Sequence, residues 1–165
     1  MAVAGERESW AELARSAAQG GEDGAPEEIR QLLVFDVAGS SYALPVEAVR
    51  EIVRLRPTTP IPRAPLDVCG VISLRGEILQ VIDLRRRIGA QASAPGRAAR
   101  VVVVQGEDAV AGLLVDGVKE VLRVVAADVQ AQIGAEGLVS GLVRRNAIFV
   151  SLIDLSRVLD LHADA

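Results

Sequence analysis

The sequence predicts a mainly β fold that consists of two repeated modules, each a small barrel of roughly five strands. Hydrophobic residues make up 50% of the 165 residues, and they are mostly Val, Leu, Ile and Ala, with only two Phe, one Tyr and one Trp. This β-branched bias favours strands. Short apolar runs separated by hairpin turns indicate small barrels, and the second half of the chain repeats the pattern of the first.

Residues 1–30 are predicted to form a flexible N-terminal tail, because they are rich in Ala, Glu and Gly and nearly free of Val and Ile. Ser9 followed by Glu12 has the pattern of a capping box, which predicts a short helix. The Gly-rich stretch at 20–26 then acts as a hinge. Two interpretations of the helix stay open: its Trp10 packs on the body of the protein, or the helix docks on a partner.

From Gln31 onward, short runs rich in β-branched residues are predicted to be strands. These runs are QLLVFDV, SYALPV, VCGVISL, EILQVIDL, RVVVVQ, AVAGLLV, GLVRR and AIFVSLIDL. Gly or Asn between the runs can take the positive φ angle of a tight hairpin. The predicted turns are Ala38-Gly39-Ser40, Arg75-Gly76-Glu77, Gly106-Glu107-Asp108 and Arg145-Asn146-Ala147.

The chain contains an internal repeat. The segment 32–55 aligns with 101–124 without a gap, and after a small indel the segment 70–88 aligns with 141–159. The second alignment matches the Ile-Asp-Leu that contains Asp83 to the one that contains Asp154. We therefore predict one domain over 31–165, with modules at roughly 31–98 and 99–165. Modules of this size are too small to be robust alone, so they should pack against each other.

The composition argues against several classes of function. The chain has 18 Lys and Arg against 22 Asp and Glu, a net charge of -4, so no long-range positive field exists to attract nucleic acid or an anionic membrane surface. Cys69 is the only cysteine, which excludes an internal disulfide and a zinc site of paired thiolates. No secretory signal or bilayer-spanning run is apparent, and we expect a soluble cytoplasmic protein.

The sequence offers little for catalysis. It has one Cys, one His at position 162, and no motif that joins them, so a nucleophile with its general base is not expected. Cys69 is interpreted as a small core residue. The repeated Asp83 and Asp154 leave one enzymatic alternative, two carboxylates that share a proton. Our interpretation is that each Asp ends a strand, where its carboxylate accepts backbone hydrogen bonds and starts a short turn or helix.

Arg75 differs from the other basic residues because it lies at a predicted hairpin between Leu74 and Gly76. Such a hairpin presents a long cation outward on a rigid support, as interface hot spots often do. The remaining basic clusters have no aromatic residues among them and are interpreted as solvated faces.

The segments GVISLRGEILQVIDLR (70–85) and GLLVDGVKEVL (112–122) resemble the CheW family of chemotaxis coupling proteins, and LLVFDVAGSSYALPVEAVREI resembles its first segment. The resemblance covers about 31–160. It implies two intertwined SH3-like five-stranded β-barrels with short helices around a shared hydrophobic seam. It also implies no catalytic activity, no cofactor and no metal.

The resemblance further implies partners. The family bridges the cytoplasmic tips of chemoreceptors, the methyl-accepting chemotaxis proteins, to the regulatory domain of a CheA-type histidine kinase in membrane-associated receptor arrays. Residue by residue, the receptor-binding groove would contain Val49, Glu51, Arg75 and Gly112. Neither nucleic-acid binding nor direct membrane insertion is implied. An adaptor of another chemosensory pathway, such as twitching motility or development, is the alternative.

Overall fold

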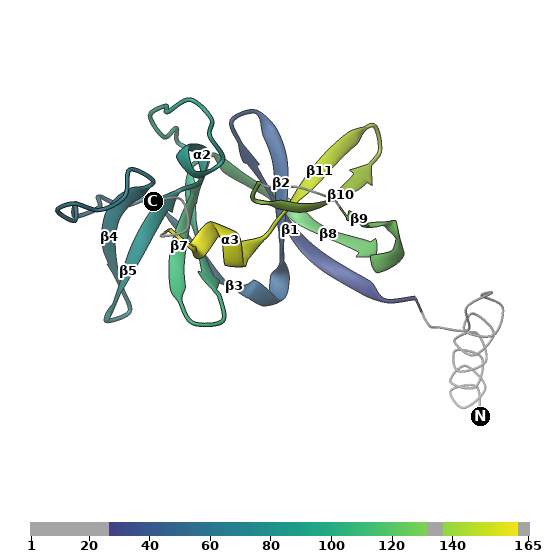
Figure 1. Cartoon of the computed structure of the whole chain (residues 1–165), viewed down its shortest axis with the longest axis horizontal. Coiled ribbons are helices and arrows are strands. Elements are labelled where there is room, and N and C mark those ends of the chain that lie inside the picture. The colour runs from purple at the N-terminus through teal and green to yellow at the C-terminus, as the bar shows by residue number, and fades with distance from the viewer. Residues whose placement is uncertain (1–26, 132–136, 162–165) are drawn as a thin grey trace.

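The computed structural model describes residues 27–131 and 137–161, whose strands form two sheets (Figure 1). Sheet A has the order β8-β1-β2-β11-β10-β9 and sheet B the order β3-β6-β7-β5-β4. The strands of sheet A are β1 (Ile29–Val37), β2 (Ser40–Pro45), β8 (Gly117–Val125), β9 (Gln130–Ala131), β10 (Val139–Arg145) and β11 (Ile148–Ile153). Those of sheet B are β3 (Val49–Arg54), β4 (Val68–Leu74), β5 (Glu77–Asp83), β6 (Arg100–Gln105) and β7 (Val110–Val115).

The two repeats are intertwined, as predicted. The first two strands of each repeat leave their own repeat and join the sheet of the other one. Parallel pairing connects the repeats within each sheet: β11 pairs with β2, and β5 pairs with β7. The segments 31–98 and 99–165 are therefore repeats in sequence, but neither one corresponds to a sheet.

The backbone irregularities repeat together with the sequence. The β3–β6 ladder has a bulge between Val49 and Glu51, and the β1–β8 ladder has its bulge at the equivalent residues of the second repeat, on β8. The β4–β5 ladder shifts between Val68 and Gly70, and the β10–β11 ladder shifts at the equivalent residues of β10. Bulges bend strands at defined positions, so the two sheets have the same local design.

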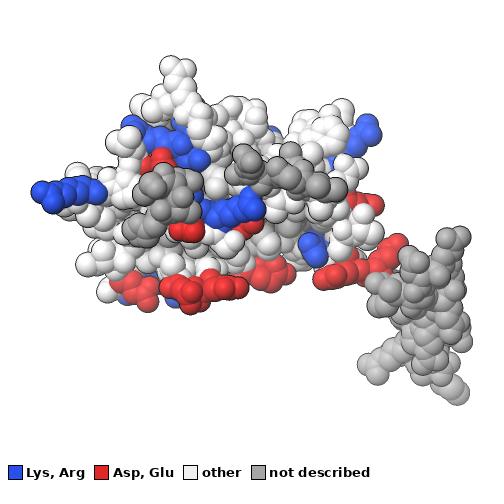
Figure 2. Space-filling model, viewed as in Figure 1, with Lys and Arg blue, Asp and Glu red and all other residues white. Residues whose placement is uncertain are grey.

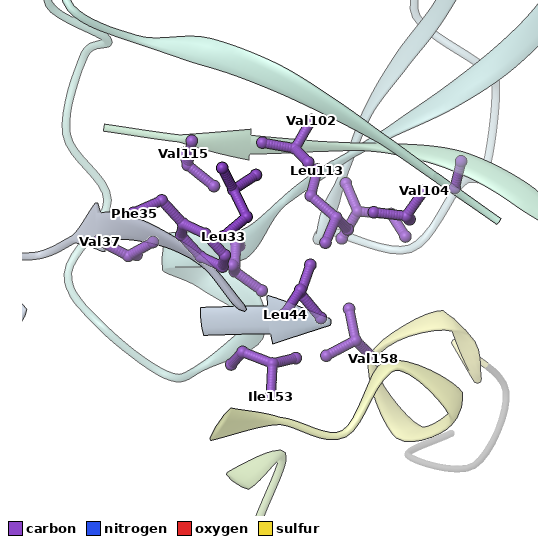
Figure 3. Close-up of a cluster of buried hydrophobic side chains, with 13 residues drawn as sticks. Leu33, Phe35, Val37, Leu44, Val102, Val104, Leu113, Val115, Ile153 and Val158 are labelled. Atoms are coloured by element: carbon purple, nitrogen blue, oxygen red, sulfur yellow. The ribbon is translucent and has the colours of Figure 1, made fainter. Parts of the chain in front are cut away.

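Three hydrophobic clusters hold the fold together. One cluster lies within each sheet, and the third, which we call the shared cluster, lies between the sheets (Figure 3). The shared cluster consists of Leu33, Phe35, Val37, Leu44, Ile82, Leu84, Val102, Val104, Ala111, Leu113, Val115, Ile153 and Val158. Along β1, Leu32 and Val34 belong to the cluster of sheet A, whereas Leu33 and Phe35 belong to the shared cluster. A strand buried on both faces has a continuous apolar run instead of an alternating one.

Each sheet curls so that its two ends approach each other. In sheet B, the chain beyond the edge strand β3 returns to the opposite edge, where Thr59 and Val71 on β4 form a β-bridge. In sheet A, the equivalent residues are Gln130 on the short strand β9 and Leu142 on β10, and they pair with each other. Because β9 counts as a strand, sheet A has six strands where the sequence predicted five. Closure into SH3-like barrels stays a prediction.

Short helices join or follow the strands, as expected. They are η1 (Val46–Ala48), α2 (Leu84–Arg87), η2 (Ala126–Asp128) and α3 (Leu155–Leu159). No helix in the described part of the chain is long and apolar enough to cross a membrane. Strand β1 begins at Ile29, so the last residues of the predicted tail belong to sheet A. The predicted helix around Trp10 and the hinge at 20–26 lie outside the described residues.

We expect that fragments 27–98 and 99–161, produced separately, do not fold. The first fragment lacks β8 and β11, which pair with its strands β1 and β2. The second fragment lacks β3 and β5, which pair with its strands β6 and β7. Thermal melts followed by circular dichroism should show no cooperative transition for either fragment, and a transition should return when the two are mixed. A cooperative transition in either isolated fragment would show that a repeat folds by itself.

Candidate functional site

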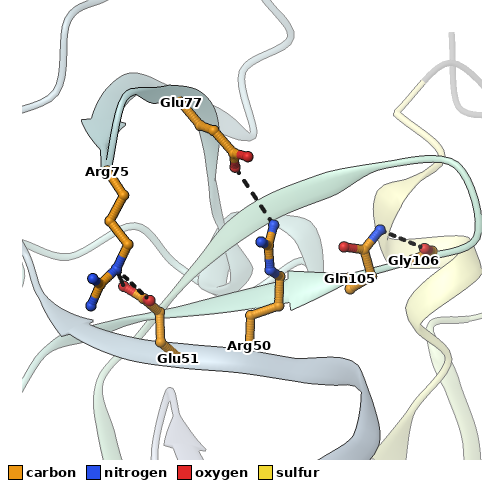
Figure 4. Close-up of polar contacts among 6 residues, drawn as sticks. All are labelled: Arg50, Glu51, Arg75, Glu77, Gln105 and Gly106. Carbon is orange, nitrogen blue, oxygen red and sulfur yellow. Dashed lines mark hydrogen bonds and ion pairs between the residues drawn. The ribbon is translucent and has the colours of Figure 1, made fainter.

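Glu51 and Arg75, both predicted to bind a partner, lie in direct contact. The Arg75 Nε donates to the Glu51 carboxylate, at 3.0 Å from Oε2 (Figure 4). Arg75 has a φ angle of 52° and is followed by Gly76 with 82°, so the β4–β5 hairpin has the tight turn that the sequence predicted. The Arg75 side chain is 79% exposed and that of Glu51 is 27% exposed. The hairpin therefore presents the cation while strand β3 holds the carboxylate.

A second ion pair lies beside the first. Arg50 on β3 is 3.6 Å from the Glu77 carboxylate on β5 (Figure 4). Strands β3 and β4 are the opposite edges of sheet B, so the two pairs tie the hairpin tip to the far edge of its own sheet. A small pocket of about 80 Å³ lies among these four residues, and its apolar lining comes from Leu74, Leu79 and Val103. Four charged side chains therefore surround a small pocket that is otherwise lined by apolar residues.

Val49 and Gly112 occupy different surroundings. Val49 is half-buried and packs against the shared cluster, two residues before Glu51 on the edge strand β3. Gly112 is buried in β7, directly opposite Val103 and Val81 in the neighbouring strands. A Cβ atom at Gly112 would lie 2.5 Å from the Val101 Cγ1. The structure thus brings Glu51 and Arg75 together near Val49, whereas Gly112 is buried in β7, and a role for Gly112 in partner binding stays a prediction.

Sheet A has an ion pair of the same kind, which the sequence did not reveal. Arg145, at the end of β10, lies 2.8 Å from the carboxylate of Glu120 on β8. Glu120 is the equivalent of Glu51 in the second repeat. That match was visible in the sequence, but the partner of Glu120 was not, because the pairing depends on how the sheet curls.

Asp83 and Asp154 are local caps, as predicted. The Asp83 carboxylate accepts a hydrogen bond from the backbone N–H of Arg85 and begins α2, and Asp154 accepts one from the N–H of Arg157 and begins α3. Each carboxylate also lies near an arginine three residues later, at 3.7 Å for Arg86 and 3.6 Å for Arg157. Both carboxylates are therefore engaged by their own helices, which is the structural role that we assigned to them.

Cys69 is half-buried in β4. Burial, reinforced by the nearby Asp83 carboxylate, raises the pKa of the Cys69 thiol, so the nucleophilic thiolate is disfavoured. Within residues 27–131 and 137–161, no group of His, Cys, Asp and Glu side chains could hold a metal ion. His162 lies outside the described residues.

The fold and the site together define a class of small, mainly β domains in which two repeats exchange strands between two sheets. A family model described as the CheW-like domain matches residues 31–163. The chain therefore belongs to the CheW-like domain family.

Individual relatives agree with this assignment. The chain is 41% identical to the chemotaxis protein CheW of Rhizobium meliloti over 101 residues, which is 61% of this chain and 65% of that protein. It is 28% identical to the chemotaxis protein CheW of Helicobacter pylori over 152 residues, 90% and 92% of the two chains. The crystal structure of the scaffolding protein TtCheW from Thermoanaerobacter tengcongensis is similar with a TM-score of 0.73 and 28% identity, covering 76% of this chain and 89% of that one.

We expect Gly112→Ala to lower the free energy of unfolding by about 1–3 kcal/mol, because the added methyl group overpacks β7 against Val101. Urea denaturation measures this change. Gly96→Ala is the matched control, since nothing lies within 4 Å of a Cβ at Gly96. Equal stability of Gly112→Ala and the native protein would contradict this prediction and show that β7 tolerates the methyl group.

We expect the Cys69 thiol to react with iodoacetamide only at higher pH in the folded protein than in the unfolded chain, because its pKa is raised mainly by burial. The pH profile of the alkylation rate, measured with and without urea, checks this, and the single cysteine makes the readout unambiguous. A folded-state midpoint at or below the unfolded one would contradict the expected shift.

Proposed function

We propose that this chain is a non-catalytic adaptor that couples chemoreceptors to a CheA-type histidine kinase in chemotaxis signal transduction. The observation that carries the proposal is the match of residues 31–163 to the CheW-like domain. The likeness to TtCheW, which is a scaffolding protein, supports it. The adaptor acts in the cytoplasm and is recruited to membrane-associated receptor arrays through its partners.

The receptor contact lies at the edge of sheet B around Glu51 and Arg75. A helical receptor tip places apolar residues near Val49, while the two charged side chains set its register through charge-assisted hydrogen bonds. The Glu51–Arg75 pair does not oppose this contact strongly, because Arg75 is 79% exposed and exposed ion pairs contribute at most about 1 kcal/mol. Charged groups of the receptor can therefore replace each member of the pair.

The tips of two hairpins offer exposed apolar groups to a second partner. Ile78 in the β4–β5 hairpin is 75% exposed and Phe149 in the β10–β11 hairpin is 55% exposed. They are equivalent residues of the two repeats, and the two hairpins lie at opposite ends of the molecule (Figure 1). Exposed apolar side chains at both ends suit a protein that lies between the regulatory domains of neighbouring kinases.

The alternative is a CheW-like adaptor that binds the same classes of partner in another chemosensory pathway, such as twitching motility or development. Similarity to Protein FrzA of Myxococcus xanthus, 33% identical over 100 residues, 61% of this chain and 62% of that protein, shows that not every relative carries the chemotaxis name. Titration against each CheA-type kinase of the same genome would distinguish the pathways.

We expect calorimetric titration to show saturable binding of the native protein to a receptor tip and to the regulatory domain of a CheA-type kinase. Arg75→Glu should weaken receptor binding at least tenfold, because it places a second negative charge beside Glu51, and should affect kinase binding less, because Ile78 and Phe149 are unchanged. Arg145→Glu is the control, since it breaks the ion pair between Glu120 and Arg145 in sheet A. Because Arg75 and Arg145 are exposed, each variant should change the free energy of unfolding by less than about 1 kcal/mol.

The charge-swapped double variant Glu51→Arg, Arg75→Glu separates partner binding from a structural role. It retains an ion pair across the sheet but reverses both charges that face the receptor, so receptor binding should stay weak. Recovery of receptor binding in this variant would show that binding requires only the ion pair between residues 51 and 75, and not the charge at each position. Absence of binding to both partners at about 100 μM, a weak affinity, would refute the adaptor proposal.

A further inference from the structure

Two arginines lie directly opposite each other near one end of sheet B. Arg54, the last residue of the edge strand β3, pairs in register with Arg100, the first residue of β6. Like charges at opposed positions of an antiparallel ladder destabilise the sheet. Arg97, in the connection that leads into β6, lines the same pocket as these two residues.

The three guanidinium-bearing residues surround a surface pocket of about 600 Å³, a size typical of small-molecule sites. Its remaining lining is formed by Leu55, Pro95, Gly96 and Ala99. A second pocket of about 370 Å³ shares Leu55 and Pro95 with it, and Arg56, Pro57, Thr58, Cys69 and Leu114 form the rest of its lining. A basic pocket thus adjoins a mixed pocket in which Leu55, Pro57, Pro95 and Leu114 supply apolar surface.

The positive charge of this pocket is not neutralised in the described part of the chain. None of Arg54, Arg97 and Arg100 forms an ion pair there, although other arginines, such as Arg50, do. The Arg100 guanidinium instead donates to the backbone carbonyls of Arg97 and Ala99, at 3.0 and 2.8 Å. These bonds hold one cation in place before a ligand arrives.

The grouping of the three arginines is not explained by a basic protein surface or by the internal repeat. The whole chain has a net charge of -4, and Figure 2 shows acidic side chains along the lower edge of the face in view. At the equivalent register position of sheet A, Gln31 is opposite Arg123. The fold therefore accepts a single cation at this position, and the second one in sheet B is specific to the pocket.

We propose that Arg54, Arg97 and Arg100 bind the phosphate group of a small phosphorylated molecule, whose other part lies over Leu55 and Pro95. A phosphate has more acceptor oxygens and more charge than a carboxylate, so it can engage three guanidinium groups at once. Binding would also relieve the repulsion between Arg54 and Arg100. This site is separate from Glu51 and Arg75, and the proposal does not depend on the adaptor function.

The test is calorimetric titration of the full chain with pyrophosphate, ADP and adenosine at about 0.15 M salt, where diffuse attraction between exposed charges is largely screened. Pyrophosphate and ADP should bind with a Kd below about 1 mM, and adenosine should not bind. Arg54→Gln combined with Arg100→Gln should weaken binding at least tenfold. Arg123→Gln, which removes the single equivalent cation of sheet A, should leave the Kd within about twofold.

Thermal unfolding provides a second readout that needs only the exposed Arg54. Arg54→Gln should raise the melting temperature in phosphate-free buffer, because it removes the like-charge pair, and should reduce the further rise that pyrophosphate produces in the native protein. The proposal fails if neither phosphate probe binds, if adenosine binds as tightly as ADP, or if Arg123→Gln weakens binding as much as the double variant. Tighter binding of a glutamate-rich peptide than of pyrophosphate would also overturn it, in favour of an acidic protein partner.

Discussion

The structure depends on one constraint: β1 and β6 are buried on both faces. Phe35 and Val102 lie in the shared cluster, whereas their neighbours Val34 and Val101 lie in the clusters of the two separate sheets. A strand of this kind needs apolar partners on each side, and it obtains them only between two sheets. The exchange of strands between the repeats supplies this environment for both β1 and β6. It also explains why neither repeat needs a core that is sufficient by itself.

The positions of the charged residues follow from this core. Because the apolar faces are used between and within the sheets, the surfaces left for partners are sheet edges, hairpin tips and the ends of the strands. Glu51 and Arg75 belong to an edge and a hairpin that the curling of sheet B brings together. The arginine pocket lies at the other end of strand β3, at Arg54. A domain with surface sites at different places suits the proposed role of an adaptor, which holds partners together without chemistry of its own.

Features that depend on neighbouring residues could be predicted from the sequence. Asp83 and Asp154 were expected to end strands and begin helices, since the capping carboxylate and its backbone donor are two or three residues apart. The turn at Arg75 and Gly76 was expected because few residue types accept a positive φ angle. The repeat was visible because equivalent residues recur at a nearly fixed offset. The matching bulges show that the repeat extends to the backbone.

The sequence by itself determined the mainly β class, the repeat, the turns, the caps and the outward placement of Arg75, because each depends on local geometry or on direct comparison of two segments. Only the tertiary structure decided which strands are neighbours, and so which distant residues meet. The contact between Glu51 and Arg75, the register of Arg54 with Arg100, and the burial of Gly112 all depend on sheet order and curvature. Those properties come from the packing of the shared cluster, to which distant parts of the chain contribute together.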